Sequence, residues 1–283
     1  MNVSKAVLIT GCSSGIGWAT AERLVDVGWR VYATARSVEK MAPLEQRGCE
    51  LLPLDVTDED SMRSAVDEVE RRDGPVGVLV NNAGYSQSGA VESVPMEKVR
   101  RQFETNFFGL ARMCQLVLPG MRRQGYGRIV NVSSMGGKLT FPGAGYYHAT
   151  KHAVEALSDA LRFEVQGFGI KVSVIEPGLI RTDFAETAVG SMDGSDGENP
   201  YAGFDESVAK ATAENYERGP FARLGGGRRS YRSCGLGPQP QEPLRRHTFG
   251  APVSAAQASP ARQGLGCGLE NDLSSTGEVE GAH

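Results

Sequence analysis

The sequence predicts a doubly wound α/β domain, in which helices cover both faces of a parallel sheet. Short runs rich in β-branched residues alternate with longer amphipathic segments as far as about residue 180. A glycine-rich loop directly follows the first of these runs. Val76 to Val80 is a nearly continuous apolar run, which is typical of a strand buried on both faces.

Strands and helices are expected in strict alternation. The strands are expected at Ala6–Thr10, Arg30–Ala35, Glu50–Leu54, Val78–Asn81, Arg128–Ser133 and Lys171–Glu176. The intervening helices are expected near 16–27, 38–47, 58–72, 96–123 and 146–166. Thr57, followed by acidic residues at 58–60, places a capping hydroxyl and negative charge at the start of the third helix.

Composition excludes several classes of protein. The chain has 283 residues, of which 40% are hydrophobic, and this is enough for one sizeable domain. The 30 basic and 34 acidic residues give a net charge of −4 without a long basic run, so nucleic acid is not an expected partner. No stretch approaches the roughly 18 apolar residues of a membrane span, and we expect a soluble, cytoplasmic protein.

The cysteines are odd in number, widely spaced and never paired as C-x-x-C. They are Cys12, Cys49, Cys114, Cys234 and Cys267. This pattern fits reduced structural thiols better than a disulfide framework.

The loop after the first strand has the pattern of a phosphate-binding turn. It reads Thr10, Gly11, Cys12, Ser13, Ser14, Gly15, Ile16 and Gly17. Gly11 permits a tight turn, Gly15 lets the backbone approach a pyrophosphate, and Gly17 allows close packing of the helix on the strand. The N–H groups of the helix N-terminus would then face the anion.

The ends of the next strands indicate which dinucleotide binds. Ala35 offers no carboxylate to a ribose 2′-hydroxyl, whereas Arg36 can pair with a 2′-phosphate, which favours NADP over NAD. The alternative is that Arg36 is merely solvated. Candidate contacts to the adenosine are Asp55, Val56, Asn82, Ala83 and Gly84, although each of these is also compatible with ordinary turn chemistry.

Three side chains have the spacing of a proton-transfer site. Tyr147 and Lys151 are four residues apart on an expected helix, so they share one face, and Ser134 lies thirteen residues before Tyr147. The phenol of tyrosine has a pKa of about 10 and exchanges protons near neutral pH only when a nearby positive charge lowers that value.

These motifs together resemble the short-chain dehydrogenase/reductase family over about residues 4–220. The matching positions are the Thr10–Gly17 loop, Asp55, Asn81 to Gly84, Asn106, Ser134, Tyr147, Lys151, Pro177 and Gly178. The stretches 32–36 and 133–151 are similar to the hydroxysteroid and retinol dehydrogenase branch. The resemblance implies a single Rossmann-type domain and an NADP-dependent oxidoreductase acting on a carbonyl or secondary alcohol.

The resemblance also implies roles for individual residues. Tyr147 would be the general acid or base, Lys151 would lower the pKa of Tyr147 and bind the nicotinamide ribose, and Ser134 would orient the substrate oxygen. Asn106 matches the residue that anchors a water in the family's proton relay, unless it only satisfies buried backbone groups. The segment expected to receive the nicotinamide carboxamide contains Pro177, Gly178, Ile180 and Thr182.

Residues 183–220 correspond to the family's variable substrate lid, in which 191–197 is expected to be mobile. Apolar side chains near the motif ends favour an apolar alcohol or ketone, although each is also compatible with a place in the core. They are Tyr85, Met135, Leu139, Phe141 and Phe184. The resemblance further implies a homodimer or homotetramer that associates through the helices at 96–123 and 146–166.

The composition changes near residue 225. Residues 225–283 contain no Lys or Ile and show neither helical nor alternating periodicity. We expect the enzyme domain to comprise residues 1–224, followed by a low-complexity tail that is either natural or translated out of frame. A damaged or purely NADP-sensing protein without turnover, and a non-enzymatic interaction protein, are the alternatives to an enzyme.

Overall fold

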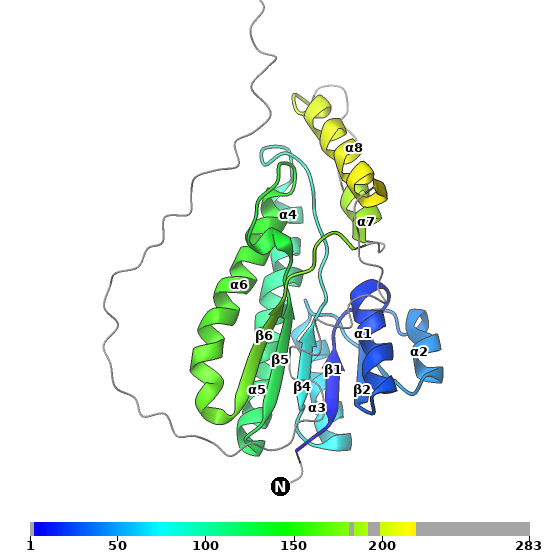
Figure 1. The fold of residues 1–283 in the computed structure, drawn as a ribbon, viewed down its shortest axis with the longest axis vertical. Coiled ribbons are helices and arrows are strands. Elements are labelled where there is room, and N and C mark those ends of the chain that lie inside the picture. Colours follow the sequence, from blue (N-terminus) through cyan, green and yellow to red (C-terminus); the bar gives the residue numbers. More distant parts are fainter. Residues whose placement is uncertain (1–2, 181–183, 192–198, 219–283) are drawn as a thin grey trace, which may run out of the picture. The chain divides into compact units, whose positions relative to one another are not determined.

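The computed structural model describes residues 3–180, 184–191 and 199–218. Six strands form one parallel sheet in the order β3-β2-β1-β4-β5-β6 (Figure 1). Their bounds are β1 Ala6–Ile9, β2 Arg30–Ala35, β3 Glu50–Pro53, β4 Val78–Asn81, β5 Gly127–Val132 and β6 Ile170–Ile175. This is the predicted doubly wound, Rossmann-type fold, because the strand order reverses between β1 and β4.

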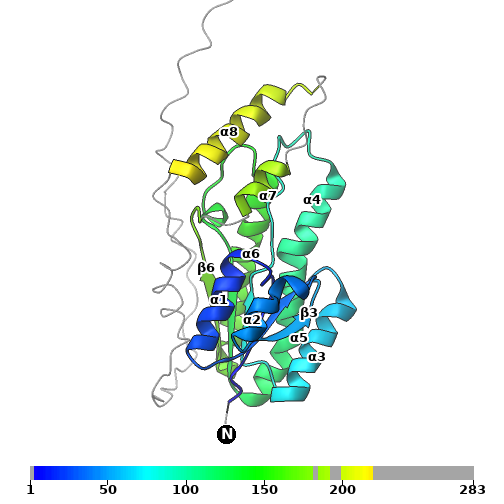
Figure 2. The ribbon, with the colours of Figure 1, turned by 90° about the vertical axis from the view of Figure 1, so that its right-hand side faces the viewer.

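Helices cover both faces of the sheet (Figures 1 and 2). The first face carries α1 (Gly15–Asp26) and α2 (Ala42–Gln46), which a 3₁₀ turn at Glu39–Met41 precedes. The second face carries α3 (Glu59–Asp73), α5 (Gly109–Gln124) and α6 (Gly145–Val165). The two hydrophobic clusters between these layers form the core.

Strand β1 shows why the sheet needs two layers. Ala6 and Leu8 pack into the cluster under α3, α5 and α6, whereas Val7 and Ile9 pack into the cluster under α1 and α2. All four side chains are at most 1% exposed. Because successive side chains of a strand point to opposite faces, this apolar run is stable only with helices on both sides.

The structure corrects two local predictions. The helix expected at 96–123 is interrupted: α4 (Met96–Phe103) and α5 are joined by a π-helical turn at Glu104–Phe108. The cap of α3 is Asp58 rather than Thr57, since the Asp58 carboxylate accepts a hydrogen bond from Ser61 N at 2.8 Å. The Thr57 hydroxyl instead donates to Asp55 Oδ1 at 2.8 Å.

Two helices follow β6 in the expected lid region, α7 (Phe184–Gly190) and α8 (Ala202–Arg218). The segment after β4 holds them in place. Ser191 accepts hydrogen bonds from Gln87 Nε2 at 2.7 Å and from Ser88 N at 2.8 Å. Asp205 Oδ1 accepts from Ala90 N at 3.2 Å.

Several sequence predictions concern residues that the structure does not describe. Thr182, residues 192–197 of the expected mobile stretch, and the tail at 225–283 all lie outside the described residues. Among the residues that are described, no helix has the length and apolar character needed to cross a membrane.

Candidate active site

The glycine loop joins β1 to α1 at the carboxyl edge of the sheet. Gly11 and Gly15 have φ angles of 73° and 62°, which favour glycine at both positions. A Cβ on Gly17 would lie 2.4 Å from the Gly11 carbonyl oxygen and 2.5 Å from Asn82 Nδ2. Gly17 therefore packs against the loop itself and against Asn82, rather than simply allowing the helix to approach the strand.

The start of α1 is open to a ligand. Its N-terminal residue Ser14 makes no side-chain capping bond, and its first turn contains no acidic residue. Ser13 and Ser14 are both exposed. The first N–H groups of any helix lack partners within the helix, so this end can bind an anion.

Thr10 and Asn82 hold the loop in shape. Thr10 Oγ1 accepts hydrogen bonds from the backbone N atoms of Asn82 and Ala83, both at 3.0 Å. Asn82 Nδ2 donates to the carbonyls of Thr10 and Gly11 at 3.0 and 2.9 Å. The Asn82 side chain is thus engaged within the loop, whereas Ala83 and Gly84 present a surface of small residues beside it.

Arg36 lies at the end of β2 and is exposed, next to the buried Ala35. Tyr85, which follows Gly84, lies within electrostatic reach of Arg36 and Arg101. Burial raises the pKa of the Tyr85 phenol, and the two arginines partly oppose that increase. The part of the site near Arg36 is therefore positively charged.

Asp55 and Val56 follow β3. Asp55 Oδ1 accepts from Thr57 N at 2.9 Å, which fixes the turn. Val56 is 7% exposed, and a Cβ on Gly109 would lie 2.3 Å from the Val56 carbonyl oxygen. The sequence alone did not show that α5 packs this closely against the turn.

The sheet and α6 bring the three proton-transfer candidates into one region. Ser134 follows β5, and its Oγ accepts a hydrogen bond from Gly136 N at 3.0 Å. The turn at Met135–Gly137 then packs against α6, where a Cβ on Gly136 would lie 2.2 Å from His148 Nδ1. Glycine at position 136 therefore allows Ser134 to lie near the helix that carries Tyr147.

Tyr147 and Lys151 are 8% and 5% exposed. Lys151 Nζ lies 5.7 Å from the centre of the Tyr147 ring and donates a hydrogen bond to the Val132 carbonyl at 2.9 Å. Burial lowers the pKa of the Lys151 ammonium to about 8, while the Glu155 carboxylate acts in the opposite direction. The arrangement places a buried cation beside the phenol, as the spacing predicted.

Asn106 lies in the π-helical turn and is fully buried. Its Oδ1 accepts from Tyr85 N at 3.0 Å, and its Nδ2 donates to Tyr85 O at 2.8 Å and to Thr150 Oγ1 at 3.2 Å. A Cβ on Gly84 would lie 3.1 Å from Asn106 Oδ1 and 3.7 Å from Lys151 Nζ. These contacts favour the second of the two roles considered from the sequence, satisfaction of buried backbone groups.

The segment after β6 lies beside Ser134. Met135 N donates to the Pro177 carbonyl at 2.9 Å. Gly178 is exposed and Ile180 is half-buried. Pro177, Gly178 and Ile180 therefore follow the strand next to β5, and Thr182 falls outside the described residues.

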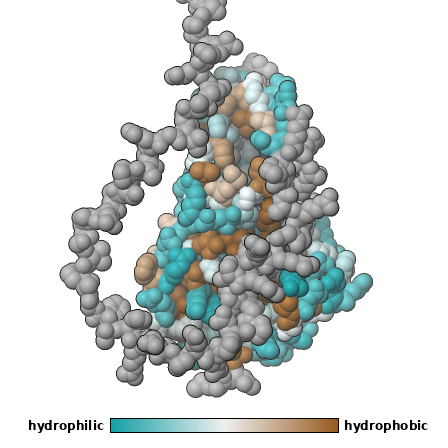
Figure 3. All heavy atoms as spheres, viewed as in Figure 1, coloured by the Kyte–Doolittle hydropathy of each residue, from teal (hydrophilic) through white to brown (hydrophobic). Residues whose placement is uncertain are grey.

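Aromatic rings lie next to Tyr147. The rings of Phe184 and Tyr147 are 5.5 Å apart between centres, and those of Phe141 and His148 are 5.6 Å apart. Leu139 and Phe141 are 50% and 45% exposed, and the part of the molecule near α7 and α8 shows brown, apolar residues among the hydrophilic ones (Figure 3). Phe184, in the expected lid region, therefore packs directly against Tyr147.

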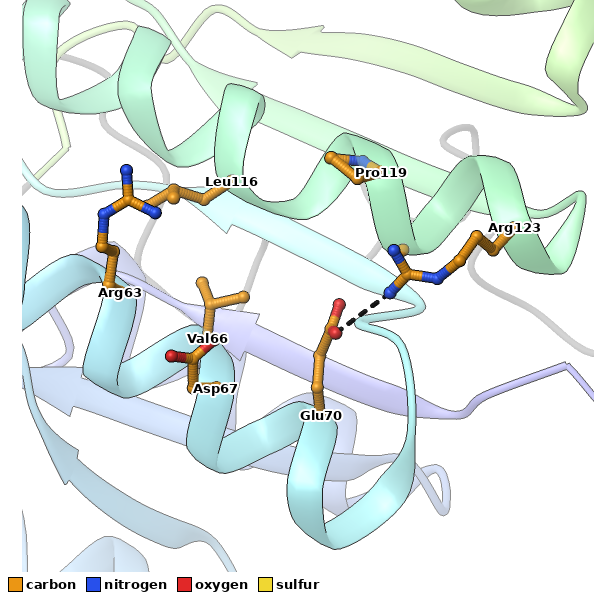
Figure 4. A pocket seen from close by; sticks show the side chains of 8 residues that line it. Arg63, Val66, Asp67, Glu70, Leu116, Pro119 and Arg123 are labelled. Atoms are coloured by element: carbon orange, nitrogen blue, oxygen red, sulfur yellow. Dashed lines mark hydrogen bonds and ion pairs between the residues drawn. The ribbon is translucent and has the colours of Figure 1, made fainter.

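A separate hollow between α3 and α5 does not belong to this site. It is lined by Arg63, Val66, Asp67, Glu70, Leu116, Pro119, Gly120 and Arg123. Figure 4 shows the Glu70–Arg123 ion pair, 3.2 Å long, across it. None of the predicted site residues lines this hollow, and we assign it no function.

The described cysteines are unreactive, and the described residues form no metal site. Burial raises the pKa of Cys12 and Cys114 to about 12 and that of Cys49 to about 11, so these free thiols are unreactive. Within residues 3–180, 184–191 and 199–218 there is no group of three His, Cys, Asp or Glu side chains that could hold a metal.

Sequence reasoning missed two buried polar residues of α6, His148 and Glu155. They are 5% and 7% exposed. Glu155 follows Lys151 by four residues, so the spacing that indicated Tyr147 and Lys151 could also have indicated Glu155. No sequence signal pointed to His148, whose Nδ1 lies 3.2 Å from the Gly136 carbonyl oxygen.

Comparison with known proteins agrees with this fold. The family model for short chain dehydrogenases matches residues 5–192. An uncharacterized oxidoreductase of Escherichia coli, YbbO, is 40% identical over 199 residues, which cover 70% of this chain and 74% of the relative. A 3-ketodihydrosphingosine reductase of Bacteroides thetaiotaomicron is 44% identical over 181 residues, 64% of this chain and 65% of that protein.

One further relative and two solved structures extend the comparison. An NADPH-dependent 3-dehydrocapnine reductase of Ornithobacterium rhinotracheale is 37% identical over 203 residues, 69% of this chain and 70% of the relative. A short-chain dehydrogenase from Streptomyces avermitilis superimposes with a TM-score of 0.70 at 38% identity, covering 82% of this chain and 84% of that one. A serine dehydrogenase in complex with NADP⁺ gives a TM-score of 0.71 at 25% identity, covering 86% and 100%.

The fold, the glycine loop and these relatives define a NAD(P)-dependent oxidoreductase. The chain belongs to the short-chain dehydrogenase/reductase family. The loop fits a dinucleotide, because positive φ angles at Gly11 and Gly15 and the absence of a side chain at Gly17 leave the helix N-terminus accessible.

Proposed function

We propose that the chain transfers a hydride between NADP(H) and a carbonyl or secondary alcohol carbon, with Tyr147 as the proton donor or acceptor. The observation that carries the proposal is the buried Lys151 ammonium beside the Tyr147 ring. A cation there stabilises the phenolate, so the phenol can release a proton to a carbonyl oxygen and recover it from an alcohol. The nicotinamide supplies or accepts the hydride.

Ser134 would orient the substrate. Because its Oγ accepts the hydrogen bond from Gly136 N, the hydroxyl proton can be donated to a substrate oxygen. Such a donor stabilises the negative charge that develops on a carbonyl oxygen during reduction. Asn106 would support this arrangement through the backbone of Tyr85.

The cofactor would lie along the carboxyl edge of the sheet. The loop residues, Thr10, Gly11, Ser13, Ser14, Gly15, Ile16 and Gly17, would hold the pyrophosphate. Adenosine contacts would come from Asp55, Val56, Asn82, Ala83 and Gly84. Tyr147 and Lys151 would bind the nicotinamide ribose, and Pro177, Gly178, Ile180 and Thr182 would receive the carboxamide.

NADP rather than NAD is the proposed cofactor. Arg36 is exposed at the end of β2, where Ala35 offers no carboxylate to a ribose 2′-hydroxyl. The O. rhinotracheale relative is named as NADPH-dependent, and one structural neighbour was solved with NADP⁺. A guanidinium can pair with the 2′-phosphate through two hydrogen bonds.

The proposed substrate is an apolar ketone or alcohol. Phe184 packs on Tyr147, Phe141 packs on the neighbouring His148, and both Leu139 and Phe141 are exposed. Two relatives are named as reductases of 3-ketodihydrosphingosine and of 3-dehydrocapnine, which favours the direction of ketone reduction. A hydroxysteroid or retinoid, as the sequence resemblance implies, is the competing substrate class.

We further propose that the enzyme forms a homodimer or homotetramer through α4, α5 and α6. Two large exposed apolar side chains support this: Phe108, in the π-helical turn between α4 and α5, is 50% exposed, and Phe163 on α6 is 74% exposed. Sedimentation analysis tests the proposal. A monomer at micromolar concentration would contradict it.

For the tail, we propose that the enzyme domain ends near residue 224 and that residues 225–283 are foreign to the fold. The change in composition supports this, and so does a codon argument: if Gly227 to Ser230 are encoded by GC-rich codons, a neighbouring frame can spell Pro-Pro-Glu. Translation of the gene in all three frames provides the test. A frame encoding a hydrophobic strand followed by a stop is expected.

A panel of carbonyl substrates tests the main proposal. Long-chain 3-keto compounds, steroid ketones, retinal and small aromatic aldehydes are incubated with NADPH or NADH, and oxidation of the cofactor is followed. Turnover of apolar ketones with NADPH is expected. NADPH binding without turnover of any substrate would indicate a sensor or a damaged enzyme, and absence of NADPH binding in calorimetry would indicate a non-enzymatic protein.

A further inference from the structure

Helix α6 carries a third buried side chain in line with Tyr147 and Lys151. Glu155 follows Lys151 by four residues, just as Lys151 follows Tyr147, so the three lie along one face of the helix. Glu155 is 7% exposed, Lys151 is 5% exposed and Tyr147 is 8% exposed. A carboxylate is rarely buried to this extent unless it is paired.

One oxygen of Glu155 connects α6 to the loop that carries Ser134. Glu155 Oε2 lies 2.9 Å from Lys138 Nζ, and Lys138 directly follows the turn at Met135–Gly137. The Lys138 side chain is half-exposed and also lies 3.6 Å from Glu176 Oε1 after β6. The ion pair therefore holds the end of the Ser134 loop against the helix.

The other oxygen of Glu155 faces the inside of the same loop. A Cβ on Gly137 would lie 3.0 Å from Glu155 Oε1 and 2.7 Å from Ser133 Oγ. Glu155 Oε1 and Ser133 Oγ are both buried and lack a hydrogen-bond partner among the described residues. Since position 137 is glycine, the carboxylate can approach the residue that precedes Ser134, and the Ser133 hydroxyl is available to donate to it.

We propose that Glu155 is a positioning residue: its carboxylate keeps Lys151 in the charged form and holds the Ser134 loop in register with Tyr147. This inference rests on the proposed function, because it concerns the cation that acts on Tyr147. It adds to that function a residue that touches neither substrate nor cofactor.

The charges around Glu155 set the expected direction. Lys138 faces Glu155 from the loop. Glu176, which follows β6, and Asp159, one turn further along α6, both act on Lys138. The Glu155 carboxylate raises the pKa of Lys151 against the effect of burial. Replacing Glu155 by a neutral residue of the same shape should therefore let Lys151 lose its proton at lower pH.

The test is the pH profile of Glu155→Gln. The basic limb of kcat/KM with NADPH is expected to move to lower pH by about one unit relative to the wild type, because Lys151 has lost a neighbouring negative charge. Lys138→Met is the matched control, since it breaks the same ion pair but keeps the carboxylate. It should lower turnover at most a few-fold without moving the basic limb to lower pH.

A measurement without cofactor separates this inference from the proposed function. The free energy of unfolding is measured as a function of pH for the wild type and for Lys151→Met, and the difference between the two gives the titration of Lys151. The same pair of measurements is then made in the Glu155→Gln background. The pH at which Lys151 titrates should again be lower in the Glu155→Gln background. If this shift occurs but no substrate turns over, the proposed function fails while the assignment of Glu155 to Lys151 stands.

An unshifted profile in Glu155→Gln, or an equal shift in Lys138→Met, would overturn the inference and leave Glu155 a structural ion-pair partner. If Glu155→Gln does not fold, the double variant Glu155→Leu with Lys138→Met replaces the ion pair by an apolar contact, which buried sites often tolerate. The same downward shift is expected there. Its absence would likewise overturn the inference.

Discussion

Lys151 Nζ lies 5.7 Å from the centre of the Tyr147 ring, and both side chains are more than nine-tenths buried. The cation is thus held beside the phenol by the fold itself, through the hydrogen bond from Lys151 to the Val132 carbonyl. Burying a charged ammonium group costs free energy, because the group loses its hydration. The lowered pKa of Lys151 reflects this cost. The cost is consistent with a group retained for its charge.

That cost predicts a pH-dependent stability. The pKa of Lys151 falls from 10.5 to about 8 on folding, so between these values the unfolded chain binds more protons than the folded one. The stability of the wild type relative to Lys151→Met should therefore rise between about pH 8 and pH 10.5, by up to about 3 kcal/mol. Denaturant unfolding of both proteins across this range measures the difference, and a constant difference would contradict it.

Gly17→Ala should impair cofactor binding through the loop. Its Cβ would lie 2.4 Å from the Gly11 carbonyl oxygen, so the loop must shift and the N–H groups of α1 lose their alignment. We expect the Kd for NADPH to rise at least about tenfold, which corresponds to about 1.4 kcal/mol. Gly203→Ala in α8 is the control, because its Cβ would meet nothing within 4 Å, and calorimetry should show unchanged binding.

Arg36→Ser should weaken NADPH binding selectively. Loss of a charge-assisted contact to the 2′-phosphate is worth about 1.5–3 kcal/mol, so the Kd for NADPH should rise by about 10- to 100-fold. The Kd for NADH should stay the same. Arg71→Ser, which removes an arginine paired with Glu68 on α3, should affect neither cofactor, and equal losses for NADPH and NADH in Arg36→Ser would refute the proposed NADP preference.

Asn106→Ala separates the two roles considered for this residue. If Asn106 serves the backbone, the variant leaves Tyr85 N unpaired and loses about 2 kcal/mol of unfolding free energy together with turnover. Gln102→Leu is the matched control, because it removes the hydrogen bond from Gln102 to Tyr85 O while the bond from Asn106 to the same oxygen remains. Its loss of unfolding free energy should therefore be smaller. Full stability with abolished turnover in Asn106→Ala would instead favour the proton relay.

The sequence predicted the parallel sheet, its helices and the shared helix face of Tyr147 and Lys151, because these depend on local periodicity. It did not predict the contacts that hold the site together. Asn82, directly after β4, donates hydrogen bonds to the carbonyls of Thr10 and Gly11. These residues are about 70 positions apart in the sequence, and only the pairing of β1 with β4 brings them together.

Local competition explains the other differences. Thr57 and Asp58 are both good capping residues. Because the Thr57 hydroxyl is bonded to the Asp55 carboxylate, Asp58 rather than Thr57 caps α3. The π-helical turn at 104–108 has no pattern that distinguishes it from the surrounding helix, yet it carries Asn106. The four-residue spacing from Lys151 could have indicated Glu155, but its burial and its pairing with Lys138 are known only from the structure.

Tyr147→Phe tests the central claim most directly. The variant keeps the ring beside Lys151 and Phe184 and removes only the hydroxyl. Because Lys151 still binds the nicotinamide ribose in this account, NADPH affinity in calorimetry should stay within about twofold of the wild type. Reduction of the best ketone in the panel should fall by about 10²-fold or more, since general acid catalysis contributes about 10²–10⁴. Undiminished turnover with intact NADPH binding would contradict the assignment of Tyr147 as the proton donor.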